Sequence, residues 1–365
     1  MMLMASGADL LNIYIGLEVM SISIYILTGF KRSKLISNEA SLKYFLLGAF
    51  ATGFLLFGIS IIYGSTGTIN LNQIACFIAE KGGRPDPLML MGMGLIIIGL
   101  GFKVASVPFH AWVPDVYEGA PTAVTAFMSV GPKAAGFAVF LRIFLTAFGS
   151  IHYEWQKIIY ILAILTMTTG NIIAIAQVNI KRMLAYSSIA HAGYLLIALV
   201  AANNMGVSGT LFYVLSYTFM NIGAFAIVII LSKKGDEFIQ INDYAGLGLK
   251  HPLLAIAMSI FMLSMAGVPP TAGFVGKFYI FSAAIKSGYI GLAIIGVINA
   301  VISVYYYLRI MVIMYMKEPA REFNPLTISP LIIAAIVISV IGTLQLGIFP
   351  SKVMEMAQQS ILILK

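Results

Sequence analysis

Four ionisable residues stand inside long apolar stretches of the sequence: Glu18, Lys103, Lys133 and Lys277. An ionised side chain at the middle of a bilayer is costly, so each of them needs a partner, a water-filled cavity or a function. Desolvation disfavours the charged form of a lysine, and an approaching carboxylate restores it. A buried lysine is therefore a switchable proton site, and we expect these four residues to carry protons.

A glutamate–lysine pair would control such a switch. If Glu18 reaches Lys103, their separation sets whether Lys103 holds its proton, and its release acts on Lys133. His191 could bridge the sites because imidazole exchanges protons near neutral pH, although a packing role fits it equally well. The alternatives are that the lysines snorkel to the interface or form inert ion pairs, and that Glu18 is a structural counter-ion.

Other polar residues receive simpler interpretations. Arg142 and Arg309 sit near the ends of apolar stretches, where snorkelling is expected. His110 lies between two prolines and is expected to cap backbone groups, whereas His152 and His251 fall in loops and are expected to carry no chemistry.

The composition is that of a membrane protein. Of the 365 residues 60% are hydrophobic and 10% charged, and the mean hydropathy is +0.96. The net charge of +8 is scattered over short loops, which does not indicate a nucleic-acid partner. The single cysteine, Cys76, excludes a disulfide framework and a four-cysteine iron–sulfur site. No phosphate-binding or dinucleotide motif is present, so we expect no cofactor and no redox centre in this chain.

Apolar runs of about 20 residues, each long enough to cross a bilayer, predict an all-α polytopic membrane protein. The expected ten spans are 8–30, 40–63, 88–106, 121–147, 156–177, 183–202, 207–232, 252–287, 288–316 and 327–349. Prolines interrupt the sequence near 107–114 and 266–273, which predicts two broken helices. Paired breaks are typical of an inverted-repeat transporter.

The distribution of Lys and Arg predicts the orientation. The loops after odd-numbered spans carry ten: Lys31, Arg32, Lys34, Lys181, Arg182, Lys233, Lys234, Lys250, Lys317 and Arg321. The other side carries six: Lys81, Arg84, Lys157, Lys286, Lys352 and Lys365. The first side is expected to face the cytoplasm and the C-terminus to face outward. Residues 350–365 are expected to form a short interfacial helix.

Three motifs carry a resemblance to a known family. They are VPFHAWVPDVYEGAP at 107–121 after Lys103, KRMLAYSSIAH at 181–191, and GVPPTAGFVGKF at 267–278. In this order they resemble subunit N of the proton-pumping NADH–quinone oxidoreductase, respiratory complex I, over essentially the whole chain. The resemblance implies an antiporter-like fold made of two inverted repeats, each with one broken helix. It also implies that Glu18, Lys103, Lys133 and Lys277 match the family's proton-carrying residues.

Further expectations follow from the resemblance. Residues 1–147 would be the remainder of the first repeat, 148–316 the second repeat, and 317–365 the final span and the interfacial helix. Family members are longer by about four N-terminal helices, which this chain would lack. NADH, FMN, iron–sulfur clusters and quinone would be bound by partner subunits of a complex in the inner (cytoplasmic) membrane. Neighbouring antiporter-like subunits would be the direct partners.

Two other functions remain open. A subunit of a multisubunit cation/proton antiporter shares the fold and the lysine pattern but is driven by an ion gradient. A structural membrane subunit would use the same charges to hold helices together. The motif PDVYEGAP at 114–121 favours the NADH–quinone oxidoreductase, in which the chain would be one subunit of a translocase.

Overall fold

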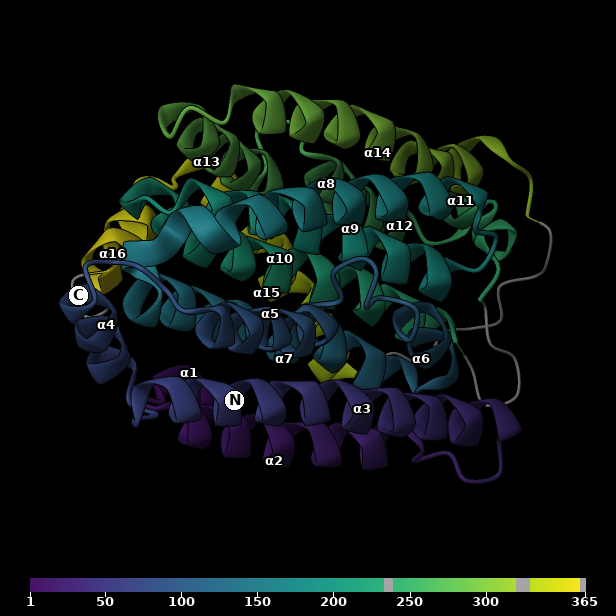
Figure 1. Cartoon of the computed structure of the whole chain (residues 1–365). Helices are drawn as coiled ribbons and strands as arrows, with labels where there is room; N and C mark the ends of the chain where they lie inside the picture. The colour runs from purple at the N-terminus through teal and green to yellow at the C-terminus, as the bar shows by residue number, and fades with distance from the viewer. Residues whose placement is uncertain (233–238, 320–328, 362–365) are drawn as a thin grey trace.

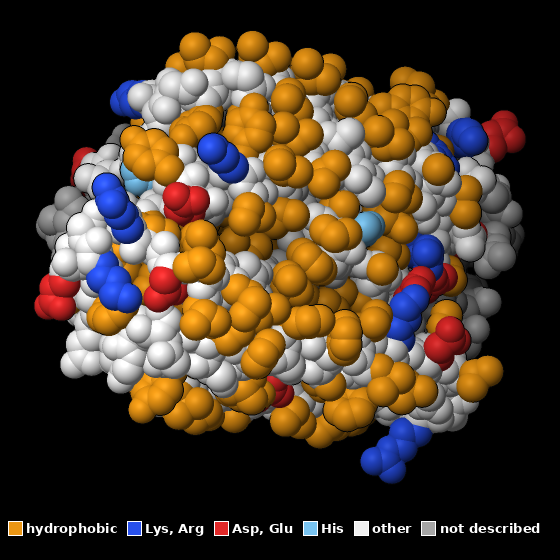
Figure 2. Space-filling view, viewed as in Figure 1, with side chains coloured by type: hydrophobic (Ala, Val, Ile, Leu, Met, Phe, Trp, Pro, Cys, Tyr) orange, Lys and Arg blue, Asp and Glu red, His pale blue; other side chains and the backbone are white. Residues whose placement is uncertain are grey.

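The computed structural model describes residues 1–232, 239–319 and 329–361, and it forms one helical bundle. The helices run side by side along the horizontal direction of Figure 1. Figure 2 shows hydrophobic side chains over the middle of this face, with most charged side chains gathered at the left and right ends. This distribution is the one expected of a molecule whose middle lies in a bilayer.

The helices of the first part of the chain are α1 (Met2–Ser6), α2 (Leu10–Thr28), α3 (Leu35–Thr66), α4 (Leu71–Glu80), α5 (Pro87–Val104), α6 (Val113–Gly119) and α7 (Thr122–Arg142), which continues into a π-helical turn at Ile143–Ala147. The later helices are α8 (His152–Ala176), α9 (Ile180–Ala201), α10 (Asn204–Leu231), α11 (Leu247–Lys250), α12 (Pro252–Ala266), α13 (Ala272–Lys286), α14 (Ile290–Met316), α15 (Pro330–Ile348) and α16 (Ser351–Ile361).

The predicted fold class is confirmed. Within the described residues, nine helices are long and apolar enough to span a membrane, and α12 is a shorter apolar helix. The predicted span 252–287 is divided into α12 and α13, as expected of a broken helix. Four of the basic residues counted for orientation lie outside the described residues: Lys233, Lys234, Arg321 and Lys365. The start of the predicted span 327–349 and the end of the predicted interfacial helix 350–365 also lie outside them, at 327–328 and 362–365.

Local sequence signals explain where several helices begin. Asp86 accepts a hydrogen bond from the Met89 backbone nitrogen at 2.7 Å and is followed by a proline, which together start α5. Asn179 and Asn203 cap α9 and α10 in the same way. Helix α4 was not predicted from the sequence, because a helix of ten residues is too short to be recognised as a membrane span.

Helix α9 is the central element of the bundle, since 94% of the residues in its most apolar 18-residue stretch are buried. It packs against α8, α10, α13 and α6. Two glycines allow the close approach of α8 and α9: a Cβ at Gly170 would lie 2.6 Å from the Ala190 backbone nitrogen, and one at Gly193 would lie 2.5 Å from that of Met167. The side chains of α9 are therefore surrounded by protein on every side.

Candidate functional site

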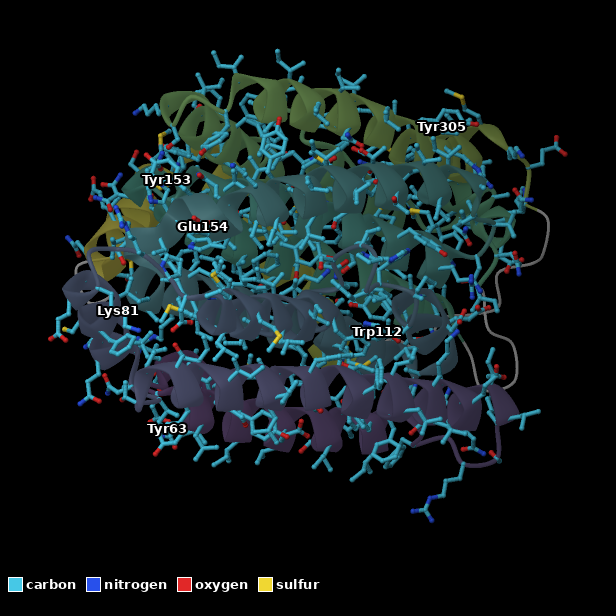
Figure 3. All side chains as sticks on the ribbon, in the orientation of Figure 1. Tyr63, Lys81, Trp112, Tyr153, Glu154 and Tyr305 are labelled. Carbon is cyan, nitrogen blue, oxygen red and sulfur yellow. The ribbon has the colours of Figure 1, made fainter. Side chains whose placement is uncertain are left out.

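The first break separates α5 from α6 inside the bundle. Ala105 has a φ of 65° and ends α5. Trp112 Nε1 donates to the Phe102 carbonyl oxygen at 3.2 Å, and the Val107 backbone nitrogen donates to Thr166 Oγ1 at 2.9 Å. Figure 3 labels Trp112 beside α6. Protein groups thus take up backbone hydrogen bonds that the break frees, as a low-dielectric setting requires.

Lys103 lies in the last turn of α5, just before this break, and its side chain is buried. Its Nζ donates to Ser21 Oγ on α2 at 2.6 Å. Glu18, one turn before Ser21, lies within electrostatic reach of Lys103, and no described residue forms a hydrogen bond with its buried Oε1. Among the described residues the two do not form a contact ion pair. The structure therefore brings Glu18 and Lys103 near one another, while the Ser21 hydroxyl that holds Lys103 donates in turn to the Leu17 carbonyl oxygen.

Lys133 is buried in the middle of α7. Its Nζ donates to the Ser188 carbonyl oxygen on α9 at 2.6 Å and to the hydroxyl of the same residue. The ring centroid of Tyr217 on α10 lies 5.7 Å from Nζ, within the range of a cation–π contact. One turn along α7, a Cβ at Gly136 would lie 4.0 Å from Lys103 Cγ. The face of α7 that carries Lys133 thus reaches Lys103 as well.

His191 is 1% exposed and held through both ring nitrogens. Its Nδ1 lies 2.5 Å from the Tyr213 hydroxyl on α10, and its Nε2 lies 2.9 Å from the Tyr307 hydroxyl on α14. His191 lies within electrostatic reach of both Lys133 and Lys277. A neutral imidazole donates from one nitrogen and accepts at the other, so its tautomer is linked to the direction of the two hydroxyls.

Lys277 closes the second break. Gly267, with a φ of 90°, ends α12, and the Gly273 backbone nitrogen donates to Ser264 Oγ at 3.1 Å. Lys277 Nζ donates to the carbonyl oxygens of Met265 at 2.8 Å and Ala266 at 3.0 Å. These carbonyls are at the C-terminal, electronegative end of α12, which stabilises a cation. The lysine of α13 therefore satisfies the backbone of the half-helix before it.

The comparisons with known proteins agree with this architecture. Residues 7–303 match the model of the NADH:quinone oxidoreductase/Mrp antiporter transmembrane family. NADH-quinone oxidoreductase subunit N of Trichlorobacter lovleyi is 56% identical over 99% of this chain and 74% of its own length. Subunit N 1 of Solibacter usitatus is 50% identical over 98% of this chain and 74% of its own length. The chain belongs to the subunit N family of NADH-quinone oxidoreductase.

Solved structures agree with this membership. A chain of respiratory complex I from Thermus thermophilus with bound aureothin is 36% identical, with a TM-score of 0.83, and the match covers 97% of this chain and 76% of that one. A chain of the Mrp complex from Dietzia sp. has a TM-score of 0.87 at 23% identity, covering 97% of this chain and 73% of that one. The second likeness concerns the fold alone. This member of the subunit N family thus has the antiporter-like fold predicted from its sequence.

The tyrosines around His191 in this subunit N family member were not predicted from the sequence. Tyr307 OH also lies 2.5 Å from Ser187 Oγ, which extends the contacts of His191 along α9. The ring centroid of Tyr217 lies 5.0 Å from that of His191, and its buried hydroxyl has no geometric hydrogen-bond partner within the described part of the chain. The sequence feature that could have predicted this cluster is the pair of tyrosines at 213 and 217, because a spacing of four residues puts both on one helix face.

A second buried polar cluster extends from Lys277 to the contact between α8 and α14. The Tyr194 ring centroid lies 4.9 Å from Lys277 Nζ. Asn171 Nδ2 donates to the Tyr194 hydroxyl at 3.1 Å and to Asn299 Oδ1 at 3.2 Å, while Tyr306 OH donates to Asn171 Oδ1 at 2.8 Å. These amides were not predicted as site residues, since single amides in apolar spans show no spacing pattern.

Acidic side chains of the family motif at 114–121 belong to a charged cluster at α6, which lies at the right-hand end of the molecule in Figure 1. Asp115 on α6 pairs with Lys43 of α3 and lies 2.8 Å from Arg182 Nη1 of α9. Glu118 lies 2.8 Å from the same guanidinium nitrogen. Partial burial acts to raise the pKa of Asp115, but the hydrogen bonds and charges of Lys43 and Arg182 outweigh it and lower the pKa below 3.8. The cluster fastens α6 between α3 and α9.

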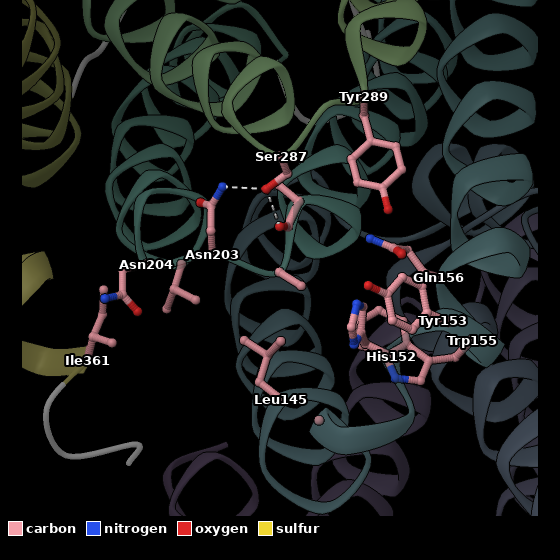
Figure 4. Close-up of a pocket in the computed structure, with 14 residues that line it drawn as sticks. Leu145, His152, Tyr153, Trp155, Gln156, Asn203, Asn204, Ser287, Tyr289 and Ile361 are labelled. Atoms are coloured by element: carbon pink, nitrogen blue, oxygen red, sulfur yellow. Dashed lines mark hydrogen bonds between the residues drawn. The ribbon is translucent and has the colours of Figure 1, made fainter. Parts of the chain in front are cut away.

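A polar pocket of about 620 Å³ opens at the opposite end, where α8, α9, α10 and α13 meet (Figure 4). Gln156 Nε2 donates to the Val200 carbonyl oxygen at 2.5 Å, and Asn203 Nδ2 donates to Ser287 Oγ at 2.7 Å. His152 lines the pocket as the first residue of α8, so its predicted position in a loop was wrong. Tyr153 and Glu154 lie at this end in Figure 3.

The two arginines near span ends bond to backbone. Arg142 Nη1 donates to the Gly7 carbonyl oxygen at 3.2 Å, and Arg309 Nη1 donates to that of Ile175 at 3.0 Å. Both guanidinium groups thus join one helix to the end of another. His110 lies in the first break, where its buried Nδ1 has no hydrogen-bond partner among the residues that the structure describes.

Proposed function

We propose that this chain is the proton-translocating membrane subunit of a NADH-quinone oxidoreductase, with electron transfer from NADH to quinone taking place in partner subunits. One observation carries the proposal: Lys103, Lys133 and Lys277 are each 4–5% exposed and held by neutral oxygens, and among the described residues none has a contact ion pair. A buried cation without a contact counter-ion is poised to lose its proton when its surroundings change.

Each lysine has a different means of holding its proton. Lys103 has the Ser21 hydroxyl, the negative end of its own helix and the nearby carboxylate of Glu18. Among the residues that the structure describes, Lys133 has Ser188 and the face of the Tyr217 ring. Lys277 has the terminal carbonyls of α12. Movement of Glu18, or of either half-helix, would therefore change which lysine retains a proton.

The proposed route runs from the Glu18 and Lys103 site through Lys133 and His191 to Lys277. The α5–α7 contact supports the first step, because Gly136 joins the Lys133 face to Lys103. The electrostatic reach of His191 to Lys133 and Lys277 supports the second. Water would complete the route, since the buried Glu18 Oε1 and Tyr217 hydroxyl need hydrogen-bond partners.

The two breaks support an inverted-repeat organisation, in which residues 1–147 belong to the first repeat and 148–316 to the second. In each repeat a lysine lies beside the C-terminal end of a half-helix: Lys103 in the last turn of α5, and Lys277 against the last carbonyls of α12. The remaining residues, 317–365, supply the last span and the terminal helix α16. We propose further that the complex lies in the inner (cytoplasmic) membrane and that NADH, FMN, iron–sulfur clusters and quinone are bound by its other subunits.

The test uses the assembled complex in sealed membrane vesicles, with NADH oxidation and acidification of the lumen measured together. We expect Lys133→Ala and Lys277→Ala each to depress proton pumping while the complex still assembles. Lys157→Ala is the matched control, because Lys157 is exposed on α8. Unchanged pumping in both buried-lysine variants would favour a structural role. A sodium requirement without dependence on NADH or quinone would favour a cation/proton antiporter.

A further inference from the structure

A groove of about 570 Å³ lies on the surface between α12 and α15, away from the polar route described above. Ala257, Ile260, Ile336 and Val340 are among the residues that line it, and Lys250 and His251 stand at one end. Only 22% of the residues in the most apolar 18-residue stretch of α15 are buried, so most of this helix faces outward from the chain. The groove therefore combines an apolar floor at membrane depth with a cationic end.

The position of Lys250 gives the groove a direction. Lys250 ends α11, two residues before α12 begins, and its side chain is exposed. It belongs to the more basic of the two sides of the chain, where anionic lipid head groups gather beside Lys and Arg. An amphiphile with an anionic head and an apolar tail would match both parts of the groove.

We propose that this groove binds an acyl chain of an anionic phospholipid from the leaflet on the Lys250 side, with the lipid phosphate at the Lys250 ammonium.

The composition of the walls favours a lipid chain over a protein helix. Helices that pack in membranes prefer small residues at their contacts, which let two backbones approach. Apart from Ala257, the apolar residues that line this groove are leucine, isoleucine, valine and one proline. Such branched side chains hold a neighbouring backbone away, whereas a flexible hydrocarbon chain fits between them. The groove is also short, because α12 has 15 residues and rises only about 22 Å.

A lipid at this site would contact α12, a helix that takes part in the proposed proton route. Helix α12 is the half-helix whose last carbonyl oxygens accept hydrogen bonds from Lys277. A lipid seated between α12 and α15 would fill the space beside the first part of that half-helix. Any effect on proton transfer rests on the proposed function, whereas lipid binding itself does not, and the experiment below measures binding alone.

The experiment reconstitutes the assembled complex in nanodiscs of phosphatidylcholine with a trace of phosphatidylglycerol that carries a photoreactive group in its acyl chain. Irradiation is followed by mass spectrometry of the peptides covering 252–260 and 333–341. We expect labelling of both peptides, and about fivefold less with Lys250→Gln, since one basic residue contributes about that factor near an anionic head group. Ala257→Trp, which fills the groove, should abolish the labelling.

Two controls make the result specific. Lys250→Arg keeps the charge and should retain the labelling, and Lys157→Gln, at an exposed position outside the groove, should not change it. The Lys250 variants decide the question even if Ala257→Trp fails to assemble. Equal labelling by a phosphatidylcholine probe, no effect of Lys250→Gln, or labelling only of a neighbouring subunit that covers the groove would overturn the proposal.

Discussion

Lys277 Nζ lies 2.8 Å from the carbonyl oxygen of Met265, so a cation on α13 closes the C-terminal end of α12. The last carbonyls of a helix have no partner within it and carry partial negative charge. Lys103 occupies a comparable place, in the last turn of α5 before the first break. Each broken helix thus presents its negative end to one buried lysine.

Replacing Lys277 by arginine tests whether pumping needs a side chain that can release a proton or only a positive charge at this position. Arginine keeps the cation and can donate to the Met265 and Ala266 carbonyls, but it does not lose its proton in proteins. We expect Lys277→Arg and Lys277→Met both to lower pumping by about tenfold or more, because a positioned proton donor contributes at least that much. NADH oxidation and vesicle acidification measure the effect. Pumping retained by the arginine variant would show that the positive charge alone is sufficient.

The tyrosine hydroxyls that contact His191 should matter more for proton pumping than an exposed tyrosine hydroxyl does. Tyr213→Phe and Tyr307→Phe each leave one imidazole nitrogen without its acceptor or donor, at a cost of about 1–3 kcal/mol. We expect about fivefold or greater loss of pumping in either variant. Tyr305→Phe is the matched control, with a change of less than about twofold, because Tyr305 is exposed on α14. Equal losses in all three would instead indicate a general packing effect.

The charged cluster at Asp115 should hold α6 in place. In Arg182→Gln, Asp115 and Glu118 lose their shared cation, and we expect faster hydrogen exchange in residues 113–119 of the assembled complex. The stabilisation should be modest, about 1 kcal/mol or less per pair, because these side chains are partly exposed. Arg182→Lys should restore part of it. Exchange as slow as in the parent chain would contradict the assignment.

The pH dependence of this cluster follows from the lowered pKa of Asp115. A carboxylate whose pKa is lower in the folded state contributes stability above its ordinary value near 3.8, and loses it as the pH falls through the lowered value. We therefore measure the melting temperature of the complex with the parent chain and with Asp115→Asn. We expect the difference between the two melting temperatures to stay constant from pH 5 to 8. A difference that vanishes within that range would show that Asp115 titrates there.

Because α8 and α9 lie in close contact, we expect a larger side chain between them to destabilise the protein strongly. A Cβ at Gly193 would meet the Met167 backbone nitrogen at 2.5 Å, so Gly193→Ala forces the helices apart at a cost of about 1–3 kcal/mol. Subunit content and thermal stability of the purified complex measure this. Gly53→Ala on α3 is the control, because among the described residues its added Cβ would meet no atom of another helix within 4 Å. Similar stability of the two variants would contradict the packing account.

The sequence by itself determined the class of fold and the candidate residues. Hydropathy over 18 or more residues predicts spans because every backbone group must be satisfied within the helix in lipid. Prolines at 108 and 114, and at 269 and 270, marked the two breaks for the same reason. Glu18 and the three lysines were recognisable because charge is rare in such stretches. Charges interrupting an apolar pattern are a local signal that one sequence is enough to read.

Only the tertiary structure decided which groups meet. The contacts of His191 with Tyr213 and Tyr307 join residues 22 and 116 positions apart, and those of Lys133 with Ser188 join residues 55 apart. Helix periodicity specifies the face on which a residue lies, but it does not specify which other helix covers that face. That choice depends on packing, as where Gly170 and Gly193 let α8 and α9 touch. The partners of each buried proton site therefore follow from the bundle as a whole.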